Sequence, residues 1–133
     1  MPGSDVQIVL VAEDDPILRM EIEDILEEAG FQAKVTIDAS EALATLEAAS
    51  ENFCALLTDI RMPNEGEGWG VARFARELQP SLPIIYMTGD SAEHWRAQGV
   101  PGSILLQKPF APAQLITALA GLLNEAAMMD IPR

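Results

Sequence analysis

Cysteine and histidine are scarce in this sequence of 133 residues, with one of each, and each shortage excludes a kind of site. The single cysteine, Cys54, cannot form an intramolecular disulfide, which suits a reducing compartment. Because His94 is the only histidine, a Ser-His-Asp triad and a histidine-ligated metal site are excluded in practice. His94 itself is expected on the solvent side of a helix. The sequence also has no GxxxxGK motif to cradle a nucleotide phosphate.

Basic side chains are far fewer than acidic ones. Eight Lys and Arg stand against 21 Asp and Glu, which gives a formal net charge of −13. So acidic a surface repels nucleic acid and anionic lipid, and we expect neither as a partner. No apolar run reaches the roughly 18 residues of a membrane span, and the first residues lack the basic flank of a signal peptide. We therefore expect a cytoplasmic protein.

The sequence does contain a regular alternation of apolar runs and helix signals, long enough for one domain. Strands separated by helices imply a parallel sheet with right-handed crossovers and helices on both faces. The predicted fold class is therefore α/β, with a doubly wound sheet of five strands. The strands are predicted at residues 7–12, 32–37, 54–58, 84–87 and 103–106, and the helices at 16–29, 38–50, 68–78, 91–98 and 112–123.

Local signals set several of these boundaries. Asp15 as N-cap and Pro16 at the first helical position open the first helix, and Gly30 ends it. Asp38 and Glu41 form a capping-box pair before the second helix. The second strand alternates, as an edge strand with one wet face does, with Ala33, Val35 and Ile37 inward and Gln32, Lys34 and Thr36 outward. The inward residues predicted for the third helix are Val71, Phe74, Ala75 and Leu78.

Polar side chains capable of chemistry follow four of the five predicted strands. Glu13 and Asp14 follow the first strand, Asp59 ends the third, Thr88 follows the fourth, and Lys108 follows the fifth. In an open α/β sheet, ligands bind beyond the carboxyl ends of the strands. We therefore predict that these residues form one site.

The acidic loop after the first strand should repel a free phosphate and hold a hard cation. Mg²⁺ takes oxygen ligands, commonly with one or two carboxylates from the protein, and Asp14 and Asp59 could supply those two. Mn²⁺ is the other candidate ion. The alternative is that Glu13 and Asp14 are merely solvated. Asp59 itself could act as a nucleophile and form an acyl phosphate, unless it is only a turn residue at the end of a strand.

Thr88 and Lys108 have the chemistry to bind a phosphoryl group. The Thr88 hydroxyl could donate to a phosphoryl oxygen, although a threonine after a strand often only caps the next helix. Lys108 could reach the acidic cluster with its flexible stem, and a surface lysine is the alternative. Pro109 follows it, and a cis bond there would turn the lysine inward.

With these residues in place, the chain resembles a response-regulator receiver domain of two-component signalling. The resemblance covers residues 7–124 and implies a flavodoxin-like (βα)5 three-layer sandwich with strand order 2-1-3-4-5. Residues 1–6 are then expected to be a disordered or expression-derived N-terminus and 125–133 a C-terminal tail, without an output domain. The segments that carry the resemblance are Val11-Ala12-Glu13-Asp14-Asp15-Pro16, Leu57-Thr58-Asp59-Ile60-Arg61-Met62-Pro63, Met87-Thr88-Gly89 and Gln107-Lys108-Pro109-Phe110.

The resemblance implies a phosphoacceptor. Asp59 would take a phosphoryl group from a phosphohistidine on a sensor histidine kinase or a histidine phosphotransfer protein, and Thr88 and Lys108 would hold the phosphoryl oxygens. Such a module catalyses its own phosphorylation and dephosphorylation but is not a turnover enzyme. Phosphorylation would then signal to a downstream protein target by a conformational change.

The resemblance also implies a metal site and a partner surface. Asp14, Asp59 and the backbone carbonyl of Arg61 would bind Mg²⁺ directly, and Glu13 would bind it through water. The partner surface would be formed by the fourth helix, fifth strand and fifth helix, with candidate residues His94, Trp95 and Leu105; many receivers have an aromatic residue where Leu105 stands.

Two other functions fit parts of the same pattern. The first is a phosphorylation-independent interaction module on the same scaffold, against which the intact acids, threonine and lysine argue. The second is an aspartate-nucleophile phosphatase of the haloacid-dehalogenase type. That family has a DxD pair on its first strand, whereas the candidate nucleophile here is on the third and Arg61 occupies the second acidic position.

Overall fold

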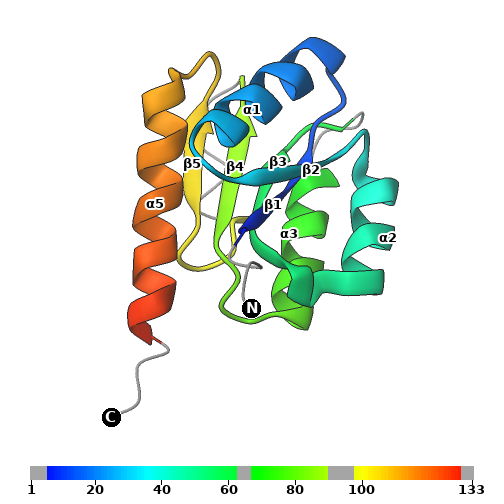
Figure 1. Ribbon diagram of the computed structural model, residues 1–133. Coiled ribbons are helices and arrows are strands. Elements are labelled where there is room, and N and C mark those ends of the chain that lie inside the picture. The colour runs from blue at the N-terminus through cyan, green and yellow to red at the C-terminus, as the bar shows by residue number, and fades with distance from the viewer. Residues whose placement is uncertain (1–5, 63–66, 90–97, 130–133) are drawn as a thin grey trace.

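The computed structural model describes residues 6–62, 67–89 and 98–129 and is built around one parallel sheet (Figure 1). Its five strands lie in the order β2-β1-β3-β4-β5, which confirms the predicted fold class and strand order. All neighbouring strands pair in parallel. The strands are β1 (Ile8–Ala12), β2 (Gln32–Thr36), β3 (Phe53–Asp59), β4 (Ile84–Thr88) and β5 (Ile104–Gln107).

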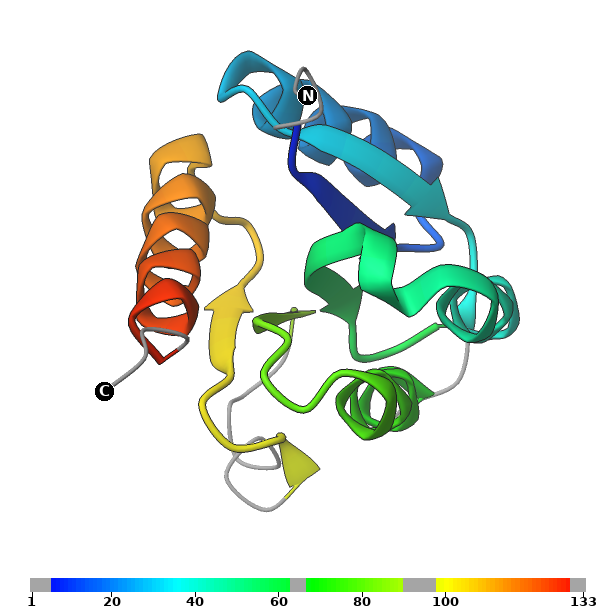
Figure 2. The ribbon, with the colours of Figure 1, turned by 60° about the horizontal axis from the view of Figure 1, so that its bottom comes forward.

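Helices cover both faces of the sheet, as Figures 1 and 2 show. Helices α1 and α5 pack on one face, and α2 and α3 on the other, so the molecule has three layers. The helix predicted at 91–98, which carries His94 and Trp95, lies outside the described residues except at its end. The described helices are α1 (Pro16–Glu28), α2 (Ala39–Ala49), α3 (Glu67–Leu78) and α5 (Pro112–Met129), with a 3₁₀ turn, η1 (Ser50–Asn52), after α2.

Capping side chains set the ends of the first two helices. The Asp15 carboxylate accepts hydrogen bonds from two amides in the first turn of α1, and Gly30 adopts a φ of +96° just after that helix, a conformation that favours glycine. The Asp38 carboxylate accepts from the Glu41 amide at 2.8 Å, and the Glu41 side chain accepts from the Ile37 amide at 3.0 Å. The predicted caps are therefore confirmed. The last helix runs to Met129, past residue 124 where the sequence placed the end of the domain.

Two apolar clusters hold the helices against the sheet. Because side chains alternate along a strand, each central strand contributes to both clusters. Leu10, Leu56 and Tyr86 face α2 and α3, whereas Val11, Leu57 and Met87 face α1 and α5. The continuous apolar runs of β1, β3 and β4 are thus explained by burial on two faces.

The predicted faces of the edge strand β2 are partly wrong. Thr36, placed on the wet face, is fully buried, and its hydroxyl donates to the Val11 carbonyl at 2.7 Å. Ile37, placed inward, lies after the end of the strand and is 51% exposed. A threonine hydroxyl can be buried at this position because the backbone carbonyl of a neighbouring strand accepts its hydrogen bond.

The inward face of α3 also differs from the prediction at its last residue. Leu78 is 43% exposed, whereas Trp69 is buried and its ring meets that of Tyr86 edge to face at 4.7 Å. The buried stripe of α3 runs through positions 68, 71, 72 and 75 at helical spacing. Leu78 lies at the C-terminal end beside that stripe and therefore remains near solvent.

Tyr86 of β4 holds the backbone of Val100, shortly before β5, and we expect its hydroxyl to matter for stability. The side chain is fully buried, and its hydroxyl oxygen accepts a hydrogen bond from the Val100 amide at 3.0 Å. In Tyr86→Phe that buried amide loses its partner, so urea denaturation at neutral pH should show a loss of about 1–3 kcal/mol in the free energy of unfolding. An unchanged free energy would contradict this assignment.

The stability difference between wild type and Tyr86→Phe should also depend on pH. Burial raises the pKa of Tyr86 above its usual value, so the native state favours the neutral phenol. The stabilisation is present below the unfolded pKa of about 10 and is lost as the pH rises above it. As the pH rises above about 10, wild type should therefore lose more stability than Tyr86→Phe.

Candidate functional site

Four strand ends bring the predicted polar residues to one edge of the sheet. Glu13 and Asp14 follow β1, Asp59 ends β3, Thr88 ends β4, and Lys108 follows β5. Strand order reverses between β1 and β3, because β2 lies on one side of β1 and β4 lies beyond β3. This switch point is where open α/β sheets bind ligands.

Lys108 connects the two buried carboxylates of the cluster. Its Nζ lies 3.0 Å from Glu13 Oε1 and 3.0 Å from Asp59 Oδ2. The exposed fractions of the side chains are 24% for Lys108, 1% for Glu13 and 8% for Asp59. The Lys108 amide also donates to the Thr88 carbonyl at 2.6 Å, and the Lys108–Pro109 bond is cis, as the sequence suggested. The two carboxylate contacts and the amide bond to Thr88 hold the lysine inward, over the acids.

Burial and the charges of their neighbours shift the pKa values of Glu13 and Lys108. Burial, with the charge of Asp59 in addition, raises the pKa of Glu13 to about 7, although the Asp15 amide and Lys108 oppose the shift. Burial alone would lower the pKa of Lys108, but its hydrogen bond to Glu13 and the charges of both carboxylates outweigh burial and raise that pKa. Lys108 is thus a fixed positive charge at this edge of the sheet.

The donor set fits a hard divalent cation. Glu13, Asp14 and Asp59 each offer a carboxylate oxygen, and these oxygens all lie within 4.8 Å of one another. Asp14 is exposed and the other two are buried, so the cluster has an open side. Oxygen ligands with room for water are the coordination that Mg²⁺ prefers. The Arg61 amide donates to Asp59 Oδ1 at 3.4 Å, which places this residue beside the cluster; the role of its carbonyl stays a prediction.

The remaining predicted residues have different surroundings. Thr88 is buried, with 7% of its surface exposed, beside the lysine that its carbonyl contacts. Leu105 is half-buried and packs against the cluster under α2 and α3, opposite Tyr86 in the β4–β5 register. His94 and Trp95 lie outside the described residues, so their place on a partner surface stays a prediction.

Two residues that lie at the site were not predicted from the sequence. Arg19 of α1 donates from its Nη1 to the carbonyl oxygens of Glu13 and Asp14. Gly68, in the first turn of α3, lies so close to the end of β3 that an added Cβ would be 2.1 Å from the Asp59 carbonyl oxygen. A basic residue four positions after an N-cap and a glycine at a helix start were the available signals, but both are common without any function.

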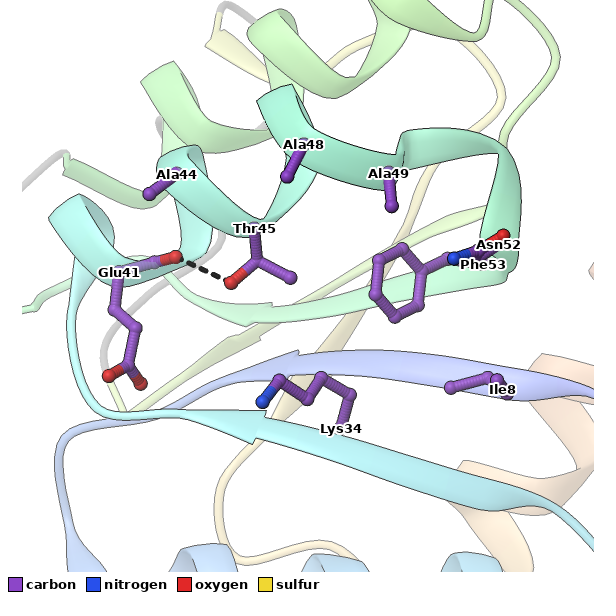
Figure 3. Close-up of a pocket in the computed structure, with 9 residues that line it drawn as sticks. All are labelled: Ile8, Lys34, Glu41, Ala44, Thr45, Ala48, Ala49, Asn52 and Phe53. Atoms are coloured by element: carbon purple, nitrogen blue, oxygen red, sulfur yellow. Dashed lines mark hydrogen bonds between the residues drawn. The ribbon is translucent and has the colours of Figure 1, made fainter.

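A separate groove of about 510 Å³ runs along α2. Figure 3 shows the groove between this helix and the sheet, with small side chains of the helix along one wall. The strands contribute Ile8, Lys34 and Phe53, and the helix contributes Glu41, Ala44, Thr45, Ala48 and Ala49. None of the acidic cluster residues lines this groove, so it is not part of the candidate site.

Fold and site together define a class of protein: a doubly wound α/β domain with a carboxylate cluster and a lysine at its switch point. The family model for the response regulator receiver domain matches residues 9–120. Because that match spans most of the chain, the chain belongs to the receiver domain family of two-component signalling. Receiver domains are in general signalling modules rather than turnover enzymes.

Individual relatives agree with this assignment. The chain is 33% identical over 120 residues to the response regulator receiver protein CpdR of Brucella abortus, covering 89% of this chain and 98% of CpdR. It is 30% identical to the transcriptional regulatory protein GltR of Pseudomonas aeruginosa, covering 92% of this chain and 51% of GltR. The chain therefore spans nearly all of one relative and about half the length of the other.

Solved structures give the same result. A response regulator receiver protein from Sinorhizobium medicae aligns with a TM-score of 0.88 and 40% identity, over 92% of this chain and 98% of that one. The receiver domain of a sensor histidine kinase from Pseudomonas aeruginosa, solved with a magnesium ion coordinated in its active-site cleft, aligns with a TM-score of 0.77 and 27% identity, over 90% and 98% of the two chains. Within the described residues, no helix has both the length and the apolar character to cross a membrane.

Proposed function

We propose that this receiver domain accepts a phosphoryl group on Asp59 from a phosphohistidine, with Mg²⁺ bound by the acidic cluster. The donor would be a sensor histidine kinase or a histidine phosphotransfer protein, in the cytoplasm. The observation that carries the proposal is the contact of Lys108 Nζ with Asp59 Oδ2 at 3.0 Å, beside three carboxylates that fit a divalent cation. The proximity of the Asp59 carboxylate to a fixed cation and a metal donor set supports Asp59 as the nucleophile.

Each residue has a defined part in the transfer. A carboxylate oxygen of Asp59 forms a bond to phosphorus in line with the departing histidine nitrogen, whose bond to phosphorus breaks. Lys108 moves from the free carboxylates to the phosphoryl oxygens and neutralises their charge, and the Thr88 hydroxyl donates a hydrogen bond to them. Asp14, Asp59 and Glu13 would hold Mg²⁺, which supplies further positive charge to the transferring group.

The proposed output is a shift between two conformations. Phosphorylation moves Lys108 and Thr88 toward the phosphoryl group, and both residues are directly connected to β5 and β4. Leu105 lies on β5 with its side chain half-buried. A change at these strand ends can therefore alter the surface near β5 and α5, where a downstream protein would bind.

Intact-protein mass spectrometry after incubation with acetyl phosphate and Mg²⁺ tests the proposed chemistry. Wild type should gain one phosphoryl group, about 80 Da, only when Mg²⁺ is present. Asp59→Asn should show no gain, whereas the matched variant Asp24→Asn, altered at an exposed aspartate of α1, should behave as wild type.

Beryllofluoride, which mimics the phosphoryl group, distinguishes a short-lived adduct from no reaction. Binding of beryllofluoride to wild type but not to Asp59→Asn would support the proposal even where the phosphorylated form decays quickly. Failure of both reagents with wild type would refute it and leave a phosphorylation-independent interaction module. Sustained multiple turnover of a small phosphate ester would instead favour the phosphatase.

A further inference from the structure

Arg19 of α1 holds the backbone of the acidic turn that carries Glu13 and Asp14. It lies on α1, one turn after the N-cap, and its Nη1 donates to the Glu13 carbonyl at 2.9 Å and to the Asp14 carbonyl at 3.2 Å. The contacts are to main-chain oxygens and not to carboxylates. A guanidinium with several donors can satisfy two neighbouring carbonyls at once.

Other contacts fix the remaining groups of this turn. The Glu13 amide donates to the Thr36 carbonyl at 3.1 Å, and the Asp15 amide donates to Glu13 Oε2 at 3.0 Å. The Asp15 carbonyl accepts from the Arg19 amide at 2.9 Å. Arg19 therefore completes a network in which the orientation of each peptide plane depends on the others.

We propose that Arg19 is a positioning residue that sets the affinity of the acidic cluster for Mg²⁺. This inference rests on the proposed function, because it concerns the same metal site. Asp14 is exposed, and its carboxylate is placed in the cluster by the main chain that carries it. When Arg19 is removed, the Glu13 and Asp14 carbonyls turn toward water, and the Asp14 carboxylate turns with its peptide unit. The bound geometry must then be recovered on binding, which weakens the affinity.

The effect should fall on metal binding and not on the chemical step. In Arg19→Met the Mg²⁺ concentration for half-maximal thermal stabilisation should rise about tenfold, the usual effect of losing a group that orients metal ligands. The rate of phosphorylation by acetyl phosphate at saturating Mg²⁺ should change less than about threefold, because the bound arrangement is then restored. Arg19→Lys retains a donor that can reach the carbonyls and should lie between Arg19→Met and wild type.

Arg76→Met is the matched control for the loss of packing and of a backbone hydrogen bond that any arginine replacement of this kind causes. Arg76 donates from its Nε to the Leu82 carbonyl at 2.7 Å, so it is also an arginine that holds a backbone oxygen, but at the far end of α3. Arg76→Met should lower the melting temperature without changing the Mg²⁺ dependence. An Arg19→Met protein that loses stability in the same way, with its Mg²⁺ dependence unchanged, would show a merely structural role and overturn the proposal.

A second measurement does not depend on metal. Hydrogen exchange of the Asp15 amide reports whether the turn stays closed, since this amide is bonded to the Glu13 side chain. Exchange without Mg²⁺ should be about tenfold faster in Arg19→Met than in wild type or Arg76→Met. Equal rates would overturn the positioning role of Arg19. A wild-type protein with no response to Mg²⁺ would refute the metal site in the proposed function, while faster exchange in Arg19→Met would still show that Arg19 orders the turn.

Discussion

Lys108→Met should accept a phosphoryl group from acetyl phosphate about a hundredfold more slowly than wild type at saturating Mg²⁺. Lys108 Nζ lies 3.0 Å from Asp59 Oδ2 and has the cationic charge that the transferring oxygens require. Methionine keeps most of the aliphatic stem but removes that charge. The rate of gain in intact mass measures the effect directly.

The same variant should also be less stable when Mg²⁺ is absent. Without the lysine, Glu13 and Asp59 are buried side by side with no cation between them. We expect a loss of about 3 kcal/mol in the free energy of unfolding. Millimolar Mg²⁺ should restore part of this loss, because the ion binds the same carboxylates.

Lys34→Met is the matched control for both measurements. Lys34 and Lys108 are the only lysines in the sequence, and Lys34 is exposed on the edge strand β2. Its replacement should leave the phosphorylation rate and the effect of Mg²⁺ on stability unchanged. A Lys108→Met protein with the phosphorylation rate of Lys34→Met would contradict the role assigned to Lys108.

Gly68→Ala should damage both the fold and the site. A Cβ at this position would be 2.1 Å from the Asp59 carbonyl oxygen and 2.7 Å from Ile60 Cα, and both are backbone atoms that cannot rotate away. The Gly68 amide also donates to the Ile60 carbonyl at 2.9 Å, so α3 cannot withdraw without losing this bond. We expect a loss of about 3 kcal/mol in the free energy of unfolding.

Phosphorylation should also slow in Gly68→Ala, by about tenfold or more, since the displaced backbone is that of Asp59 itself. Gly70→Ala tests whether this effect comes from the close approach. Gly70 lies on the exposed side of the same helix, and a Cβ added there would have no atom within 4 Å. Alanine at this position should therefore stabilise the protein by about 0.5–1 kcal/mol. Similar losses in the two variants would contradict the steric explanation.

The element types and the residues at the strand ends could be predicted because they depend on local patterns. Apolar runs such as that of β3 and N-caps such as Asp15 are recognised from a few consecutive residues. The errors lie at the ends of elements. Thr36 and Leu78 lie at the last position of their elements, where the environment depends on neighbours from other parts of the chain.

The contacts of Arg19 and Gly68 could not be predicted in the same way. Arg19 reads as an ordinary exposed charge on a helix, and only the path of the turn before α1 places its guanidinium on two carbonyls. Gly68 reads as a helix start, and only the packing of α3 against the end of β3 makes a side chain intolerable there.

The local sequence pattern was sufficient to predict the succession of strands and helices along the chain and the helix caps. It also predicted acids, a threonine and a lysine at the strand ends. These features follow from the spacing of neighbouring residues. The tertiary structure decided which of these groups touch. Lys108 is 95 residues from Glu13 and 49 from Asp59, yet its Nζ lies 3.0 Å from both carboxylates. Only the strand order β2-β1-β3-β4-β5 brings those ends together, because distant segments become neighbours through sheet pairing and helix packing and not through local preference.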